Sequence, residues 1–430
     1  MDKIRLTGWL VLGVAALVTA AAVTMPSPLG ELPRAYGATS ASASASQVDD
    51  RGELVSAEHL RTVPAEQVAA ELTSDGFDTG TVRYGVDTYR LVYRTIDAQR
   101  RPTIASGLLV LPRNDARRLR TVSFTHGTEL FKGDAPSVAT DVWGSAPAIT
   151  YASAGFAAVA PDYLGLGVGP GTHPWMDVPS ETTASLDMLR AARRLVARTG
   201  RELRREVLVT GFSQGASAAM GLARALQAGA DHRFQLAAVA PISGAYDLRH
   251  AEVPALLNVN GQLDPKAGVI YLAYLLIAWN RLHHLYDSPA EVFQPPFDNT
   301  IEQLFDTQHT GQQVVIGTPD DIGQLLTPHA FQMLRHPTGP LAAAFRIADS
   351  TCTNWTPRAP IRLYMATADE QAANANSYHC QAALRSHGTD APIVSVGDVG
   401  HLDSNRLGTA AVVRWFLQLR WQGHRSRPRT

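Results

Sequence analysis

The sequence predicts an α/β fold with a mostly parallel central sheet flanked by helices. Short runs rich in β-branched residues alternate along the chain with longer segments rich in Ala, Leu and Arg. The first pattern is typical of buried parallel strands, and the second is typical of the amphipathic helices that cover them. A third observation is a long interval between two predicted strands, which predicts a helical segment inserted into the fold.

The composition is that of a folded protein with little net charge. Of the 430 residues, 45% are hydrophobic and 18% are charged, which excludes a disordered chain. Lys and Arg number 38 and Asp and Glu number 39, so no excess of positive charge exists to bind a nucleic-acid backbone. We therefore expect a neutral small molecule as the partner and no nucleic acid. The oligomeric state does not follow from the sequence.

The N-terminus has the layout of an export signal. Lys3 and Arg5 precede an apolar run over residues 6–23, which ends near three consecutive alanines of the kind that a signal peptidase requires. We expect residues 1–24 to be a signal peptide, with an uncleaved membrane anchor as the alternative. Residues 25–48 contain the small-residue repeat ATSASASASQ and are expected to be a linker. Both alternatives place the remaining chain outside the cytoplasm, secreted or in the cell envelope.

Periodicity places the strands and helices of the main domain, residues 49–250 and 351–424. Residues 81–96 and 103–112 alternate as antiparallel strands do. Buried parallel strands are expected at residues 120–125, 157–161, 206–210, 235–242, 361–366 and 392–396. Helices are expected at residues 180–199, 214–228 and 407–421.

Residues 251–350 interrupt this rhythm and are expected to form an inserted cap or lid. The segment is far longer than the few residues of an ordinary connection between two strands. Its run VIYLAYLLIAW at residues 269–279 is too short to span a membrane and too hydrophobic for an exposed helix. We expect the core helix of the cap there, with the lining of a pocket for an apolar substrate as the alternative.

One sequence motif predicts a catalytic residue. Gly211-Phe212-Ser213-Gln214-Gly215 fits G-x-S-x-G, lies directly after a predicted strand and directly precedes a predicted helix. This strand–turn–helix context is what the motif requires, because the sharp turn exposes the serine. Gly211 and Gly215 give the chain room for a turn with strained dihedral angles. We therefore expect Ser213 to be a nucleophile held at this turn.

A nucleophilic serine needs a base, and the base needs an acid that orients it. His401 lies in a glycine-containing loop after the last predicted strand, a placement that most of the other histidines lack. Asp369 ends the strand-like segment IRLYMATAD, in the turn after the penultimate strand. We expect His401 to be the base and Asp369 the acid. The competing carboxylates, adjacent to Asp369, in the loop of the histidine or after an earlier strand, are Glu370, Asp398 and Asp247.

The reaction also needs backbone N–H groups that stabilise a developing oxyanion. Gln214 supplies one such group because it follows the nucleophile. Thr128, which follows His126 and Gly127 at the end of a predicted strand, is expected to supply the second, with Gly127 as the near alternative. We expect His126 itself to have a structural role.

These residues resemble the α/β-hydrolase superfamily and, more narrowly, the secretory lipases of the fungal lipase A type and their bacterial relatives. The resemblance rests on GFSQG together with VAPDYLGLG followed by GTHP, SLDMLRAAR, and NWTPRAPIRLYMATADE. The chain order Ser213, Asp369, His401 is the order of that superfamily. The resemblance implies an α/β-hydrolase fold with a helical cap between two strands, and hydrolysis of carboxylic esters.

We therefore expect a secreted serine esterase or lipase that forms an acyl-enzyme from a small-molecule ester or lipid. Contact with a membrane or a lipid interface is left open. No metal or organic cofactor is expected, because no cluster of histidines or carboxylates has ligand spacing. An acyltransferase with the same triad, and a non-catalytic binding protein on a hydrolase fold, are the alternatives.

Cys352 and Cys380 are the two cysteines of the chain. Thiols of exported proteins oxidise, so we expect a disulfide between them rather than a metal or redox site. They flank the predicted strand that leads to Asp369, where a bridge would brace the loop of the acid.

Overall fold

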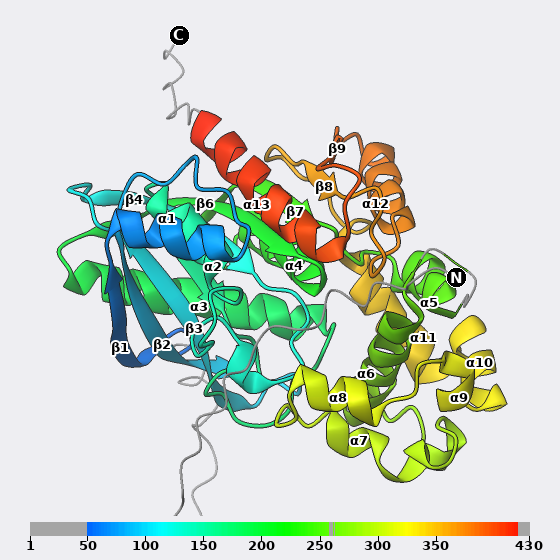
Figure 1. The fold of residues 1–430 in the computed structure, drawn as a ribbon. Helices are drawn as coiled ribbons and strands as arrows, with labels where there is room; N and C mark the ends of the chain where they lie inside the picture. The colour runs from blue at the N-terminus through cyan, green and yellow to red at the C-terminus, as the bar shows by residue number, and fades with distance from the viewer. Residues whose placement is uncertain (1–49, 258–260, 262, 420–430) are drawn as a thin grey trace, which may run out of the picture. The chain divides into compact units, whose positions relative to one another are not determined.

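A computed structural model describes residues 50–257, 261 and 263–419. The signal peptide or anchor expected at residues 1–24 and the linker expected at residues 25–48 lie outside the described residues. In the described part of the chain, one sheet has the strand order β1-β2-β3-β5-β4-β6-β7-β8-β9 (Figure 1). The strands are β1(Leu54–Val63), β2(Val86–Ile96), β3(Pro102–Pro112), β4(Arg118–Thr125), β5(Ala157–Pro161), β6(Glu202–Phe212), β7(Gln235–Ile242), β8(Leu363–Met365) and β9(Ile393–Ser395).

The sheet is antiparallel at its start and parallel beyond β5. β1 pairs with β2, β2 with β3 and β3 with β5 in the antiparallel direction. Every later pair is parallel, from β5 with β4 through to β8 with β9. The carboxyl ends of the parallel strands therefore meet at one edge of the sheet. The predicted fold class, a mostly parallel sheet flanked by helices, is confirmed.

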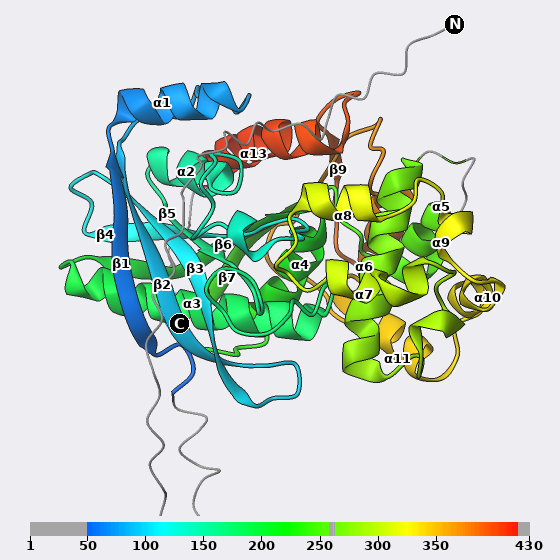
Figure 2. The same ribbon diagram turned by 60° about the horizontal axis from the view of Figure 1, so that its bottom comes forward.

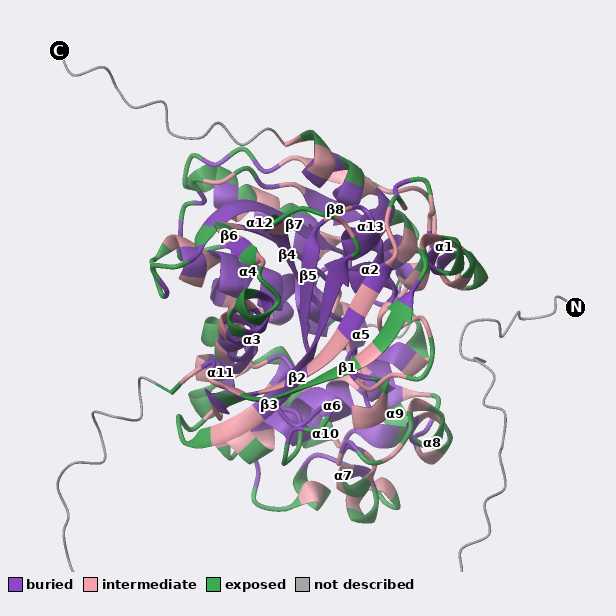
Figure 3. Cartoon of the chain, turned by 90° about the vertical axis from the view of Figure 1, so that its left-hand side faces the viewer, coloured by how far each residue is buried: buried purple, intermediate pink, exposed green. Residues whose placement is uncertain are grey.

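Helices cover both faces of the sheet (Figure 2). The hydrophobic core on one face includes α3(Val178–Arg198), α4(Gln214–Gln227) and α12(Ala375–Ser386). The core on the other face includes α1(Ala65–Ser74), α2(Ala146–Ser153) and α13(His401–Gln418). Successive strand residues alternate between the two cores, as the pleat requires, and the strands are buried along most of the sheet (Figure 3). Examples are the pairs Leu108 and Leu109, Ala158 and Val159, and Leu208 and Val209.

Some sequence-based expectations need correction. β1, α1 and α2 were not predicted, and β1 lies at the edge of the sheet with mostly exposed side chains, so it lacks the alternation that marks a half-buried strand. The last helix begins at His401 and not at residue 407. Gly400 precedes its first residue, and the first turn, His-Leu-Asp-Ser, is too polar to show the apolar periodicity of a helix.

Between β7 and β8 the regular secondary structure of the described chain is helical, apart from an isolated β-bridge between Phe293 and Leu326. The segment begins with the π-helix η2(Leu248–Glu252). Its α-helices are α5(Val253–Leu257), α6(Pro265–His283), α7(Ile301–Leu304), α8(Gly311–Gly317), α9(Ile322–Leu325), α10(Pro328–Arg335) and α11(Gly339–Ala348). Short 3-10 helices are η3(Pro289–Glu291), η4(Phe297–Asn299) and η5(Asp349–Thr351), besides η1(Lys132–Asp134) earlier in the chain. The boundaries of the insertion as a separate cap domain stay a prediction.

Helix α6 is the central element of the insertion. All residues from 269 to 279 are buried except Tyr271, which is partly exposed. They pack with Leu130, Trp175 and the other insertion helices in one hydrophobic core. No helix of the described residues is long and apolar enough to cross a membrane. The expectation of a core helix at residues 269–279 is confirmed.

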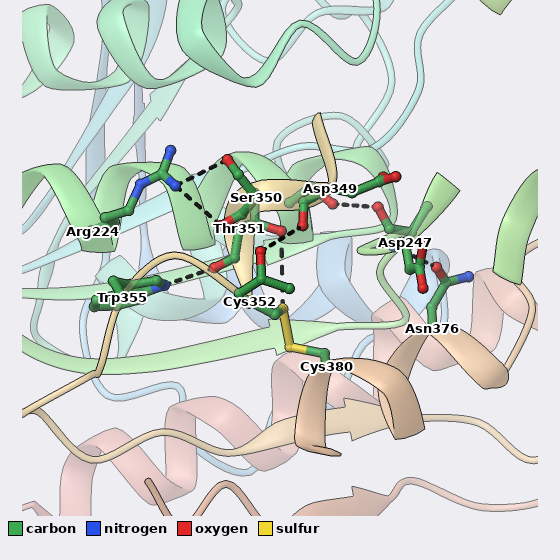
Figure 4. Close-up of a disulfide and its surroundings, with 12 residues drawn as sticks. Arg224, Asp247, Asp349, Ser350, Thr351, Cys352, Trp355, Asn376 and Cys380 are labelled. Atoms are coloured by element: carbon green, nitrogen blue, oxygen red, sulfur yellow. Dashed lines mark hydrogen bonds between the residues drawn. A yellow bond between two sulfur atoms is a disulfide. The ribbon is translucent and has the colours of Figure 1, made fainter. Parts of the chain in front are cut away.

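A disulfide joins Cys352 and Cys380, as predicted (Figure 4). Cys352 follows η5 at the end of the insertion, and Cys380 lies in α12, the helix after Asp369. The bridge therefore connects the insertion to the segment that carries the predicted acid.

We expect the double variant Cys352→Ser, Cys380→Ser to lower the free energy of unfolding by about 3–4 kcal/mol, because the cross-link restricts the unfolded chain. Urea unfolding of the exported protein measures this change. Two free thiols titrated in the native exported protein, or wild-type stability of the double variant, would contradict the expectation.

Candidate active site

Ser213 occupies a tight turn between β6 and α4. Its φ of 56° and ψ of −123° lie in a region that side-chain-bearing residues rarely adopt. A Cβ at Gly215 would overlap the carbonyl oxygens of Thr125 and His126, and a Cβ at Gly211 would overlap the Gly215 carbonyl. Both flanking positions therefore require glycine, and the turn directs the Ser213 side chain away from the surrounding backbone.

His401 and Asp369 meet this serine through two hydrogen bonds in series. His401 Nε2 lies 2.9 Å from Ser213 Oγ. His401 Nδ1 lies 2.9 Å from each carboxylate oxygen of Asp369. The His401 and Asp369 side chains are almost fully buried, whereas Ser213 is partly exposed. The structure thus brings together the three residues that the sequence predicted as nucleophile, base and acid.

Asp369 keeps its charge in this buried position. Burial alone would raise the pKa of its carboxyl group, but His401 and the backbone N–H groups of Ala372 and Gln371 hold the pKa below its usual value. The two backbone donors lie 2.9 and 3.0 Å from Asp369 Oδ1. A charged carboxylate at Nδ1 fixes the tautomer that carries its proton on Nδ1. His401 Nε2 is then free to accept the proton of the Ser213 hydroxyl.

The competing carboxylates do not reach the imidazole ring of His401. Glu370 Oε2 accepts a hydrogen bond from the His401 backbone N–H at 3.0 Å. Asp398 accepts from the Thr367 hydroxyl, and Asp247 contacts His250 and His379. Glu370 therefore fixes the backbone of the base, a contact that sequence reasoning did not anticipate.

The loop after β4 passes beside Ser213. A Cβ at Gly127 would lie 3.5 Å from Ser213 Cβ. The next residue, Thr128, accepts a hydrogen bond at its hydroxyl from Trp175 Nε1 at 3.0 Å. Within the described residues, the backbone N–H groups of Gln214 and Thr128 have no hydrogen-bond acceptor. Two unpaired donors near the serine are what an oxyanion site requires.

A buried polar cluster holds the Gln214 side chain. Its Nε2 donates to His173 Nε2 and to Glu181 Oε1, each at 2.7 Å. His173 Nδ1 in turn donates to the Leu164 carbonyl at 3.0 Å. Burial lowers the pKa of His173 to about 3 and raises the pKa of Glu181 to about 8, so both groups are neutral near pH 7. Sequence reasoning considered only the backbone N–H of Gln214 and missed this cluster.

His126 has the structural role expected of it. Its Nδ1 lies 2.8 Å from the Gly127 carbonyl, and its ring packs 4.3 Å from the ring of Tyr163. Burial lowers its pKa to about 4, so the ring stays neutral. Among the described residues, no group of three His, Cys, Asp or Glu side chains is arranged to hold a metal ion.

We expect Glu181→Gln to change how stability depends on pH. The raised pKa means that folded Glu181 keeps its proton up to about pH 8, whereas in the unfolded chain the residue loses it near pH 4.5. Wild-type stability therefore falls as the pH rises from about 4.5 to 8. The variant keeps an oxygen for the Gln214 amide and carries no such proton. Its Tm relative to wild type should therefore rise between about pH 5 and pH 8 in thermal unfolding. A Tm difference that stays constant over this range would contradict the assignment.

Comparisons with known proteins agree with the fold. No protein-family model matches the sequence, and no curated protein matches it significantly. The rice cell wall degrading esterase LipA from Xanthomonas oryzae is 25% identical, with a TM-score of 0.77 over 86% of this chain and 98% of LipA. A candidate hydrolase from Legionella pneumophila is 24% identical, with a TM-score of 0.78 over 86% of this chain and 99% of that protein.

Lipase A from Candida antarctica, in its closed state, is a more distant neighbour. It is 16% identical, with a TM-score of 0.62 over 86% of this chain and 81% of the lipase. The sheet order, the serine turn and these neighbours together show that the chain has the α/β-hydrolase fold and resembles esterases and lipases in structure.

Proposed function

We propose that the protein is an exported serine hydrolase of carboxylic esters, an esterase or lipase. The observation that carries this proposal is the pair of hydrogen bonds from Ser213 Oγ to His401 Nε2 and from His401 Nδ1 to Asp369. A hydroxyl group becomes a strong nucleophile when an oriented base removes its proton. The structural similarity to an esterase and a lipase supports an ester as the substrate.

In the proposed mechanism Ser213 Oγ attacks the ester carbonyl while His401 Nε2 takes the hydroxyl proton. Asp369 stabilises the resulting imidazolium by its charge. The backbone N–H groups of Gln214 and Thr128 donate to the oxyanion of the tetrahedral intermediate. His401 then returns the proton to the leaving alcohol, and an acyl-enzyme on Ser213 remains. A water molecule, deprotonated by the same histidine, hydrolyses the acyl-enzyme and releases the acid.

The surroundings of Ser213 support an apolar substrate. Trp175, whose indole N–H holds Thr128, stacks on Tyr271 and Tyr274 of α6, with ring centroids 5.9 and 5.1 Å apart. The apolar core of the insertion therefore reaches the loop that is proposed to bind the oxyanion. Such a surface favours a neutral acyl or alcohol group. The disulfide agrees with export to an oxidising compartment.

The test of the proposal is the loss of activity on removing the Ser213 hydroxyl. We expect Ser213→Ala to lower kcat on an activated ester on the order of 10⁶-fold and to abolish labelling by a fluorophosphonate probe. Ser217→Ala is a matched control in α4, the helix that follows Ser213, because the Ser217 hydroxyl donates to the Ala245 carbonyl and does not contact His401. Labelling that is absent from wild type, or equal in wild type and Ser213→Ala, would overturn the proposal.

Acyl-chain preference separates a lipase from an esterase of short-chain substrates. We expect kcat/KM for p-nitrophenyl esters, from acetate to palmitate, to rise beyond acetate, because the apolar insertion adjoins the site. A maximum at acetate would remove the lipase assignment and leave the esterase assignment in place.

A further inference from the structure

Glu252 is a buried carboxylate that the proposed mechanism does not use. It is the last residue of η2, where the chain leaves the sheet and enters the insertion, and it is 4% exposed. Burial raises the pKa of Glu252 to about 7, although two hydrogen bonds to its carboxylate oppose the shift. Burying a carboxylate costs free energy unless hydrogen bonds or a neighbouring charge compensate for the lost water.

Glu252 is hydrogen-bonded to the turn that holds Asp369. Glu252 Oε2 accepts from the Ala373 backbone N–H at 2.9 Å and from Asn376 Nδ2 at 2.6 Å. The two preceding backbone N–H groups, at residues 371 and 372, donate to Asp369. Consecutive amides of one turn are thus divided between two carboxylates. The position of Glu252 therefore limits how the Asp369 carboxylate can move.

Asn376 joins this turn to the first segment of the insertion. Its side chain is fully buried, and its Oδ1 accepts from the Asp247 backbone N–H at 2.9 Å (Figure 4). Its Nδ2 donates to the Ala373 carbonyl as well as to Glu252. Asn376 and Cys380 both lie in α12, so the hydrogen bonds and the disulfide connect the same helix to both ends of the insertion.

The charge of Glu252 also acts on the triad. The negative charge of Asp369 disfavours the ionised form of Glu252, and a protonated His401 favours it. The charge of Glu252 in turn disfavours ionisation of Tyr271. Other titratable groups near η2 have their own partners. Asp349 accepts from the backbone N–H groups of Leu248 and Arg249, and His379 contacts Asp247. A protonated His401 is thus the group of the triad whose charge favours the ionised form of Glu252.

We propose that Glu252 is a positioning residue of the active site. It holds the Asp369 turn against the first segment of the insertion, and its negative charge favours the imidazolium that forms when Ser213 gives up its proton. This inference rests on the proposed hydrolase function.

The experiment compares Glu252→Gln and Glu252→Ala in the full exported chain, with kcat and KM measured against pH and normalised to sites labelled by a fluorophosphonate. Glutamine retains an oxygen for Ala373 and Asn376 but removes the charge. We expect the acid limb of kcat/KM to move to lower pH in Glu252→Gln, because the carboxylate whose charge is coupled to a protonated His401 is gone. Alanine also leaves two buried donors unpaired, so kcat should fall about 10- to 100-fold with little change in KM, and glutamine should recover most of this loss.

Asp349→Asn is the matched control. Asp349 is a partly buried carboxylate of the same region whose pKa is raised to about 7 by burial, but it binds the first turn of the insertion and not the Asp369 turn. We expect it to lower Tm and to leave the acid limb and kcat per labelled site unchanged. If Asp349→Asn shifted the acid limb as much as Glu252→Gln, the specific role of Glu252 would be overturned.

The outcomes separate the two proposals. If wild type and Ser213→Ala were equally active, the hydrolase function would fail whatever Glu252 does. If Ser213→Ala were inactive while Glu252→Gln kept the wild-type acid limb and kcat, the positioning role would be overturned. Glu252→Gln decides the matter even if the alanine variant does not fold.

Discussion

The close approach of α4 to the end of β4 is the contact on which the site depends. Gly215 lies directly against the carbonyl groups of Thr125 and His126, and the Thr125 hydroxyl donates to the Gly215 carbonyl at 2.6 Å. No side chain fits between the helix and the strand at this point. The approach forces the strained backbone at Ser213, and it also brings the loop with Gly127 and Thr128 beside the serine. The nucleophile and the proposed oxyanion donors therefore share one packing constraint.

The local environment gives the buried carboxylates different charges. Asp369 has two backbone donors and the imidazole of His401, and these contacts outweigh the cost of burial and lower its pKa. Glu181 has one amide donor, from Gln214, and its second oxygen has no hydrogen-bond partner within the described residues. Burial therefore dominates at Glu181 and raises its pKa. Glu252 also accepts two hydrogen bonds and still has a raised pKa, so the neighbouring His401, and not burial or donor number alone, keeps Asp369 ionised.

The sequence predicts those features that depend on local pattern. Alternating or continuous apolar runs indicated most of the strands, and G-x-S-x-G in its strand–turn–helix context located Ser213. The positions of His401 and Asp369 followed from their place after predicted strands, since the ends of parallel strands meet at one edge. The exposed strand β1 escaped prediction because its side chains lack a buried face.

The polar residues that support the site could not be predicted in the same way. Glu252 stands in the stretch AEVPALL, whose apolar neighbours give no sign of a polar partner. Its partner Asn376 lies more than a hundred residues away in the sequence, across the whole insertion. Glu181 and Gln214 are likewise brought together only by the packing of α3 on α4. Single-sequence patterns report which face of a helix is apolar, and they do not report which distant side chain completes a buried hydrogen bond.

The length of the strands explains why such support is needed at one side of the site. Ser213 follows β6, which spans 11 residues and pairs along most of its length with β4 and β7. Asp369 and His401 follow β8 and β9, which span three residues each. The β8 segment pairs with β7 at Ile242 and Tyr364 and at one further bridge, between Val239 and Ile361. A ladder this short restrains the following loops weakly. The disulfide, the Glu252–Asn376 contact and the hydrogen bond from the Asp264 N–H to the Glu370 carbonyl at 2.7 Å supply the restraint that the sheet does not. The helical insertion is therefore part of what fixes the geometry of the acid and the base, in addition to adjoining the serine.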